Sequence, residues 1–226
     1  MNRDARIAED FKNYKIFLKE YFPKFDSTDS NLLEFYKYVN NAFVLCDILI
    51  EYDKVKESDN FFNLLIEYRE FYARLLTTVA INDKFLVENI FRVIAEKLYR
   101  LLYGRLRQGR QERAIRRESR ANMKKDLDGH MESGNFTMLN DLYNDFSTKV
   151  HHTVSVPTDY FNLTQRLESK NDFLKDCIAN MEKVEKIFLE EIFLSLSPDS
   201  DNEETSYKMK IRNNTTDYII NSLKLI

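Results

Sequence analysis

The stretch DKFLVENIFRVIAEKLYRLL, residues 83–102, decides the fold of this chain. Its apolar side chains recur at three- and four-residue steps, so they share one face of a helix. These are Phe85, Leu86, Ile90, Phe91, Ile94, Leu98, Leu101 and Leu102. Asp83 stands before the helix as a suitable N-cap. Charged residues recur every four residues along another face of this helix, so Arg92 and Glu96 lie next to each other on that face.

The composition of the whole chain favours the same kind of structure. The 226 residues include only four glycines and three prolines, and 31% of the residues are charged. Long helices with few sheet-forming turns are typical of this composition. We predict an all-α fold: an antiparallel bundle of about six to seven helices that forms one domain over residues 1–226.

Other segments of the chain repeat the helical spacing of apolar residues. They lie at about 4–21, 32–52, 61–81, 137–150, 167–196 and 205–223. Ser30 and Ser58 are N-cap candidates for the second and third of these helices. Cys46 and Cys177 lie far apart inside helical patterns, which predicts two buried thiols and no disulfide.

Several classes of protein are excluded by what the sequence lacks. No apolar run approaches the length needed to cross a bilayer, and the first six residues contain no apolar signal segment, so we expect a cytoplasmic protein without membrane contact. His130 has no second ligand at metal spacing. No phosphate loop, dinucleotide fingerprint or nucleophile elbow occurs, so we expect neither a metal nor a cofactor.

The segment from Lys97 to Lys125 is strongly basic. It contains eleven Lys or Arg residues against only Glu112 and Glu118, an excess of nine positive charges in a chain whose net charge is −3. We predict a basic helical arm at about 104–127, inserted between core helices, that projects or is mobile because it has little apolar surface to bury.

The arginines of this predicted arm are candidates for contact with a nucleic-acid backbone. They are Arg105, Arg107, Arg110, Arg113, Arg116, Arg117 and Arg120. A solvated charged helix is the alternative interpretation. A third is docking of the arm on an acidic partner protein or on a second copy of the chain.

The end of the helix predicted near 137–150 carries the candidate site. Tyr143, Ser147 and His151 recur at four-residue steps, so they can address one place. Histidine is the side chain best suited to move protons near neutral pH. If this helix packs against the helix at 83–102, Arg92 and Glu96 add a cation and a carboxylate to the same site. Alternatively, His151 only stabilises a helix C-terminus, and Arg92 and Glu96 form an intrahelical pair.

The phrase Tyr143-x-x-Phe146-Ser147-x-x-Val150-His151 resembles the Tyr-x-x-Leu-Ser-x-x-Val-His ending of the HEPN (higher eukaryotes and prokaryotes nucleotide-binding) superfamily. Phe146 replaces the usual leucine. Many members of that superfamily belong to bacterial abortive-infection, toxin and other antiviral defence systems.

A second motif extends the resemblance upstream. The spacing Arg92-x-x-x-Glu96 is similar to that of the Arg-to-Glu helix that often precedes the ending in HEPN families. The resemblance spans about residues 83–157. It implies an all-α bundle, commonly a homodimer, whose active members cleave RNA without a metal through an arginine and a histidine.

This sequence departs from the HEPN nuclease motif at one place. The standard motif has arginine four to six residues before the histidine, where this chain has 145–147, Asp-Phe-Ser. The resemblance therefore requires an arginine from elsewhere, and Arg92 is the candidate. In the ribonuclease that it implies, His151 acts as base or acid, Arg92 clamps the phosphate, Ser147 or Tyr143 orients them, and Glu96 holds Arg92 or the imidazole. The alternative is a catalytically inactive HEPN-like bundle that binds nucleic acid or a defence-system partner protein through its basic arm.

Overall fold

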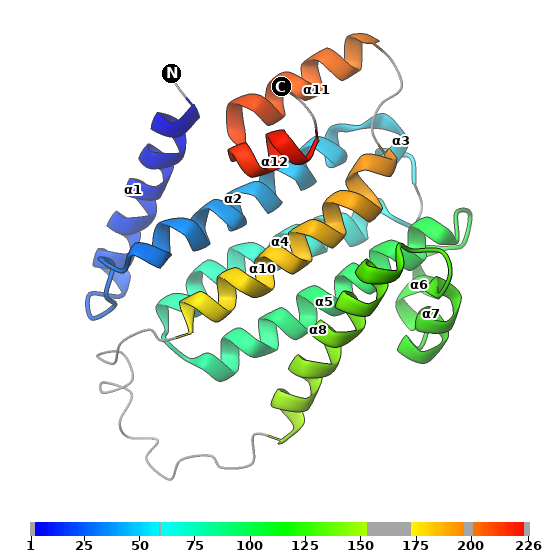
Figure 1. The fold of residues 1–226 in the computed structure, drawn as a ribbon, viewed down its shortest axis with the longest axis horizontal. Coiled ribbons are helices and arrows are strands. Elements are labelled where there is room, and N and C mark those ends of the chain that lie inside the picture. The colour runs from blue at the N-terminus through cyan, green and yellow to red at the C-terminus, as the bar shows by residue number, and fades with distance from the viewer. Residues whose placement is uncertain (1–2, 59, 153–172, 197–200, 224–226) are drawn as a thin grey trace.

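The computed structural model describes the backbone of residues 3–58, 60–152, 173–196 and 201–223. Side chains are described over the same ranges except at 3–4, 53–54, 150–152 and 201–205. All regular structure in these ranges is helical, which confirms the all-α prediction (Figure 1). None of the described helices is both long and apolar enough to cross a membrane.

Five helices form the centre of the described bundle, and each packs on two of the others in a closed ring. They are α2 (Ser30–Glu51), α4 (Phe62–Ala80), α5 (Lys84–Leu106), α8 (Ser133–His152) and α10 (Leu174–Phe188). Helix α4 lies between α2 and α5, and α10 closes the ring by packing on both α2 and α8. The inward side chains of these helices belong to one hydrophobic core.

The remaining helices surround this ring. Short α3 (Asp53–Lys56) follows α2, and α1 (Arg3–Tyr21) and α11 (Asp201–Asn214) both pack on α2. The single helix predicted at 205–223 is in fact two helices. Thr216 adopts an extended backbone conformation and begins a separate helix, α12 (Asp217–Ser222). Breaks of this kind explain why more helices are found than the six to seven expected.

The helix caps agree in part with the sequence prediction. The carboxylate of Asp83 caps α5, where it accepts a hydrogen bond from a backbone N–H of the first turn at 3.2 Å. At α2 the cap is Asp29 rather than Ser30. Ser58 does not cap α4 either, because its hydroxyl donates to the side chain of Asn60 at 3.0 Å.

The C-terminal end of α10 departs from regular α-helix. Leu189–Phe193 forms a turn of π-helix, and Leu194–Leu196 follows as a 3-10 turn. In the π turn the backbone hydrogen bonds span five residues instead of four. The guanidinium of Arg105 in α5 donates to the carbonyl of Glu191, inside this turn. The end of α10 is thereby tied to α5.

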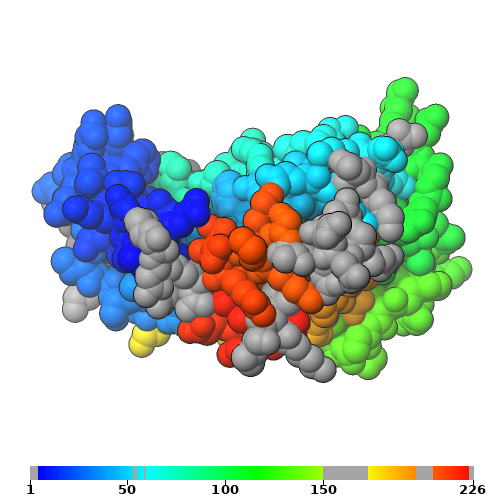
Figure 2. Space-filling view, turned by 90° about the horizontal axis from the view of Figure 1, so that it is seen from above, coloured from blue at the N-terminus to red at the C-terminus, as the bar shows by residue number. Residues whose placement is uncertain are grey.

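The basic segment does not project, which corrects the prediction of an arm. Helices α6 (Glu112–Arg117) and α7 (Arg120–Leu127) pack against α5 and form the end of the molecule opposite to α1 (Figure 1, Figure 2). Ile115, Met123 and Leu127 are only 0%, 1% and 2% exposed. Because these three side chains enter the core, the segment has an apolar face that its arginine-rich pattern conceals.

The two cysteines are free and buried, as the sequence predicts. Cys46 lies in α2 and Cys177 in α10. Burial raises the pKa of the Cys177 thiol to about 12 and also raises the pKa of Cys46. Both thiols therefore remain protonated and unreactive at neutral pH.

Candidate functional site

Helix α5, which carries Arg92, packs along α8, which carries Tyr143 and Ser147, as expected from the sequence. The ring of Phe91 stacks on that of Phe146 with their centroids 5.3 Å apart. Further along, the ring of Tyr99 meets that of Tyr143 edge-on at 6.0 Å. A higher residue number on α5 therefore lies beside a lower residue number on α8, which shows that the two helices run antiparallel.

This register gives the level of Arg92 along α8. Arg92 follows Phe91 directly, so it lies at the level of the turn that joins Tyr143 to Ser147. Both Arg92 and Ser147 are half-buried. His151 belongs to the last turn of α8, five residues beyond Phe146, a rise of about 7.5 Å along the axis. The side chain of His151 lies outside the described residues.

The guanidinium of Arg92 has no partner in the described part of the chain. Its Nε is buried and makes no hydrogen bond, and no ion pair of Arg92 occurs among the described side chains. A buried donor without an acceptor costs about 1–3 kcal/mol, and more when it is charged. An anion bound at this place would remove that cost.

Glu96 is not the partner of Arg92. Its carboxylate accepts from Nη2 of Arg100 at 2.9 Å, as an i to i+4 pair on α5. Arg100 in turn donates from Nη1 to the backbone carbonyls of Ile115 and Arg116, each at 2.9 Å. Glu96 and Arg100 therefore attach the end of α6 to α5, and the expectation that Glu96 holds Arg92 is wrong in this structure.

Tyr143 is covered by Arg120, which sequence reasoning placed in the nucleic-acid-binding arm. The guanidinium carbon of Arg120 lies 3.9 Å from the centre of the Tyr143 ring, and Nη2 donates to Asn144 at 2.8 Å. Behind Tyr143, the phenol of Tyr99 donates to the buried amide oxygen of Asn140. No spacing in the sequence indicates this contact, since α7 and α8 are joined by a turn whose direction the sequence leaves open.

Most arginines of the basic segment form internal contacts. Arg107 pairs with Asp126 at 2.7 Å, and Arg110 pairs with Glu118 at 3.0 Å. Arg105 is half-buried and bonded to the backbone of the π turn, and its burial lowers the pKa of its guanidinium. These three positive charges are therefore largely used within the fold.

Arg116 pairs with two carboxylates. Its guanidinium binds the carboxylate of Glu67 in α4 through two nitrogens, one of them at 2.9 Å, and also binds Glu112. Hydrogen bonds from Arg116, and to a smaller extent from Lys97, lower the pKa of Glu67 to about 2. Among the arginines proposed for nucleic-acid contact, Arg113 and Arg117 are exposed and make no ion pair with a described residue.

No metal site is found in the described part of the chain. No group of three His, Cys, Asp or Glu side chains there lies close enough to hold a metal ion. His130 is exposed.

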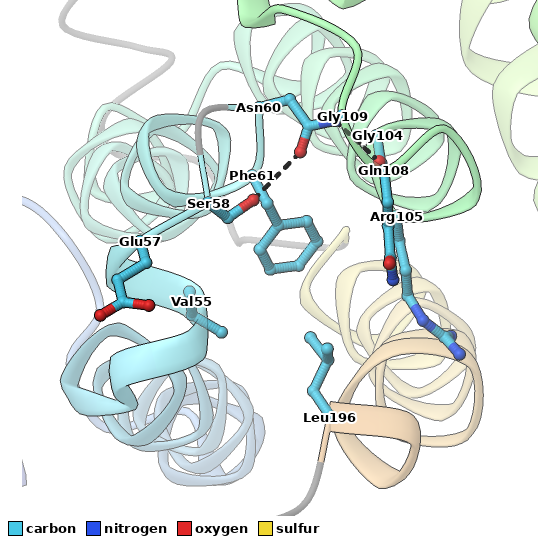
Figure 3. Close-up of a pocket in the computed structure, with 10 residues that line it drawn as sticks. All are labelled: Val55, Glu57, Ser58, Asn60, Phe61, Gly104, Arg105, Gln108, Gly109 and Leu196. Carbon is cyan, nitrogen blue, oxygen red and sulfur yellow. Dashed lines mark hydrogen bonds between the residues drawn. The ribbon is translucent and has the colours of Figure 1, made fainter.

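A hollow of about 380 Å³ that the sequence did not indicate lies at the C-terminal end of α5 (Figure 3). Phe61 and Leu196 point into it from opposite sides, while Arg105 runs along one wall toward the end of α10. The amide of Asn60, which is 4% exposed, donates to the carbonyl of Gly104 at 3.2 Å. A Cβ at Gly104 would come within 3.1 Å of the backbone oxygen of Asn60, so glycine permits this close packing.

Two polar side chains of this hollow are already engaged, because Asn60 donates to the carbonyl of Gly104 and Arg105 donates to the carbonyl of Glu191. Comparison with known proteins adds no further assignment. No protein-family model, no curated protein and no solved structure matches this chain.

Proposed function

We propose that this chain binds RNA on the face shared by α5 and α8 and cleaves it without a metal ion. The observation that carries the proposal is the half-buried Arg92, whose guanidinium has no partner among the described residues and which lies on α5 at the level of Ser147 in α8. A guanidinium presents paired donors that match two oxygens of a phosphate.

The proposed chemistry needs two proton transfers and one cation. His151 of one subunit takes the proton of the 2′-hydroxyl, and the 2′-oxygen attacks the phosphorus. The bond to the 5′-oxygen breaks as His151 of the partner subunit donates a proton to it. Arg92 holds the phosphate oxygens while negative charge builds on them, and Tyr143 or Ser147 orients the reacting groups. The products are a 2′,3′-cyclic phosphate and a 5′-hydroxyl.

The setting of this activity follows from the resemblance of the end of α8 to HEPN proteins. We place the nuclease in the cytoplasm, as a homodimer in an antiviral defence or toxin system. Because two imidazoles divide the acid and base roles, the proposal requires the dimer.

The test is cleavage of an end-labelled single-stranded RNA by the purified chain in the presence of EDTA. We expect His151→Ala and Arg92→Ala to lower the rate by about 10²–10⁴-fold, the usual contribution of a general acid or base. Matched controls are His130→Ala and Arg74→Ala, which remove an exposed histidine and an exposed arginine elsewhere. Undiminished cleavage by His151→Ala, or activity that EDTA abolishes, would refute the proposal.

A catalytically inactive bundle that binds nucleic acid or a partner protein is the second candidate. Two observations favour it: the Asp-Phe-Ser sequence at 145–147 where nucleases of the resembled family have arginine, and the engagement of Glu96 by Arg100. Binding would use the exposed cations of the basic segment, Arg113 and Arg117.

Fluorescence anisotropy with labelled RNA at several salt concentrations separates the two candidates. For the inactive binder, Arg113→Glu combined with Arg117→Glu should abolish binding and His151→Ala should leave it unchanged. Each lost phosphate contact should reduce the slope of log K against log salt by about 0.7–0.9. Lys12→Glu combined with Lys19→Glu, at exposed positions on α1, is the control with the same change in charge. Equal weakening by both double variants would exclude a localised interface.

A further inference from the structure

Arg120, the first residue of α7, is held over an aromatic ring of α8. Its guanidinium carbon lies 3.9 Å from the centre of the Tyr143 ring and 5.6 Å from the centre of the Tyr99 ring. Both distances are within the roughly 6 Å at which an aromatic face attracts a cation. Nη2 of Arg120 also donates to the side chain of Asn144 at 2.8 Å. The guanidinium is therefore held by a ring on one face and by an amide at its edge.

The ring under Arg120 is supported from the core. The edge-on contact of Tyr143 is with Tyr99, at 6.0 Å between their centroids. Tyr99 is 0% exposed, and its phenol donates to the side chain of Asn140, which is 6% exposed. Tyr99 cannot turn without losing this buried hydrogen bond, so Arg120 rests on a well-fixed pair of rings.

The charge of Arg120 has no counterpart in the described structure. Arg107, Arg110 and Arg116 of the same basic segment each pair with a carboxylate. Arg120 makes no ion pair with a described residue, and its Nε is buried without a hydrogen-bond partner. Fixing a long side chain costs conformational entropy, which no ion pair offsets at this position. The contrast indicates that Arg120 serves a ligand from outside the chain.

The position of Arg120 along α8 is close to the level of Arg92. Tyr143, which Arg120 covers, precedes Ser147 by four residues, a rise of about 6 Å. Arg92 lies at the level of Ser147, so about one helical turn separates the two arginines along this axis, a length that one nucleotide can span. Arg120 is half-buried, with one face on Tyr143 and one donor on Asn144. The opposite face of the guanidinium remains for a planar group.

We propose that Arg120 is a specificity-determining residue of the nuclease, whose guanidinium stacks between the ring of Tyr143 and an unpaired base next to the scissile phosphate. This inference rests on the proposed cleavage of RNA at the α5–α8 face. Unpaired bases of RNA stack on aromatic rings and on the planes of arginine guanidinium groups. A base inside a duplex is covered on both faces by its neighbours, so Arg120 selects RNA in which this base is unpaired.

Binding of a labelled short oligouridine, followed by fluorescence anisotropy, tests this inference. The full chain carries His151→Ala so that the strand stays intact. Arg120→Lys keeps the charge and removes the planar group. It should weaken binding by about fivefold or more, as expected for the loss of one stacked base, and leave the salt dependence unchanged. On an abasic strand with the same number of phosphates, Arg120→Lys should have no effect.

Arg74→Lys is the matched control, because Arg74 is exposed and its guanidinium carbon lies 4.7 Å from the centre of the Phe71 ring on α4. It should leave binding unchanged. Tyr143→Phe retains the ring under the guanidinium and should bind the oligouridine as the parent does. Tyr143→Leu removes that ring and should weaken binding as much as Arg120→Lys.

The inference is overturned if no strand binds, if Arg120→Lys leaves the affinity for oligouridine unchanged, or if its effect is equal on the abasic strand. An equal loss in Arg74→Lys also overturns it. Cleavage is measured separately, in the presence of EDTA. RNA cleavage together with an Arg120→Lys variant that binds like its parent refutes the stacking role alone. Binding with the expected preferences but without cleavage refutes only the nuclease and leaves the stacking role of Arg120 supported.

Discussion

Replacing Glu185 by glutamine should make the protein more resistant to unfolding at alkaline pH. The native carboxyl has a pKa of about 8, against 4.5 for the free group, because burial penalises its charge. Asn41 supplies one hydrogen bond, and Oε1 has no partner among the described residues. A glutamine at this position accepts the same bond and cannot ionise.

The sign and size of the effect follow from proton linkage. Below about pH 4.5 the carboxyl of Glu185 is protonated in both native and unfolded chains, and it contributes no pH dependence. Between the unfolded and native pKa values only the native state keeps the proton, so the free energy of unfolding falls as pH rises. The difference of about 3.5 pH units at about 1.36 kcal/mol per unit gives a loss of about 5 kcal/mol by pH 9. That is a large share of the roughly 5–15 kcal/mol that stabilises a typical domain.

Urea unfolding, followed by circular dichroism at pH 5, 7 and 9, measures this loss in the wild type and in Glu185→Gln. All other titrating groups are common to the two chains, so the difference between their unfolding free energies isolates Glu185. The two should be similar in stability near pH 5, and the variant should be several kcal/mol more stable at pH 9. Glu182→Gln, at an exposed neighbour on the same helix, should reproduce little of the effect. Parallel stability curves from pH 5 to 9 would refute the reasoning.

Three further substitutions test contacts that hold the helices together. Arg100→Met removes the charged donor to the last carbonyls of α6, so it should destabilise the fold by about 1.5–3 kcal/mol and speed amide hydrogen exchange over 112–118. Tyr99→Phe removes a buried hydrogen bond to Asn140 and should lower the free energy of unfolding in urea by about 1–3 kcal/mol. Because the pKa of Glu67 is lowered to about 2, chiefly by Arg116, its stabilising contribution is present above pH 4.5 and is lost as pH falls toward 2. Glu67→Gln should therefore show a smaller drop in melting temperature between pH 6 and pH 3 than the wild type; an equal drop would mean that the pair contributes nothing.

The long helices of this chain could be predicted because their apolar spacing is regular over several turns. The stretch 83–102 is the clearest case: α5 begins at Lys84, and Asp83 caps it. The all-α class followed from the same signal together with the scarcity of glycine and proline.

The packing of the basic segment could not be predicted in the same way. Its buried residues Ile115, Met123 and Leu127 are separated by charged positions and by the break between α6 and α7. One acidic partner of its arginines comes from a distant part of the chain, since Glu67 and Arg116 are 49 residues apart. A count of local charge therefore predicted a projecting basic arm where the folded chain has a packed segment with ion pairs.

The candidate site stays a prediction, because the side chain of His151 lies outside the described residues. The packing of α5 on α8 brings Arg92 to the level of Ser147, as the hypothesis required, but Glu96 is taken by Arg100. Glu185 was missed, although it follows Met181 by four residues on the apolar face of α10 and so falls at a core position. A charged residue inside an otherwise apolar stripe was the available signal.

The π turn at Leu189–Phe193 has a consequence for comparing this chain with others. Such a turn accommodates one residue more than an ordinary helical turn of the same length. Deleting a single residue there should restore a regular helix, leave the segments on either side in phase with each other, and displace the Glu191 carbonyl from Arg105. A homologue without this turn should therefore align with a one-residue gap at 189–193, and it should have no need of an arginine at the position of Arg105.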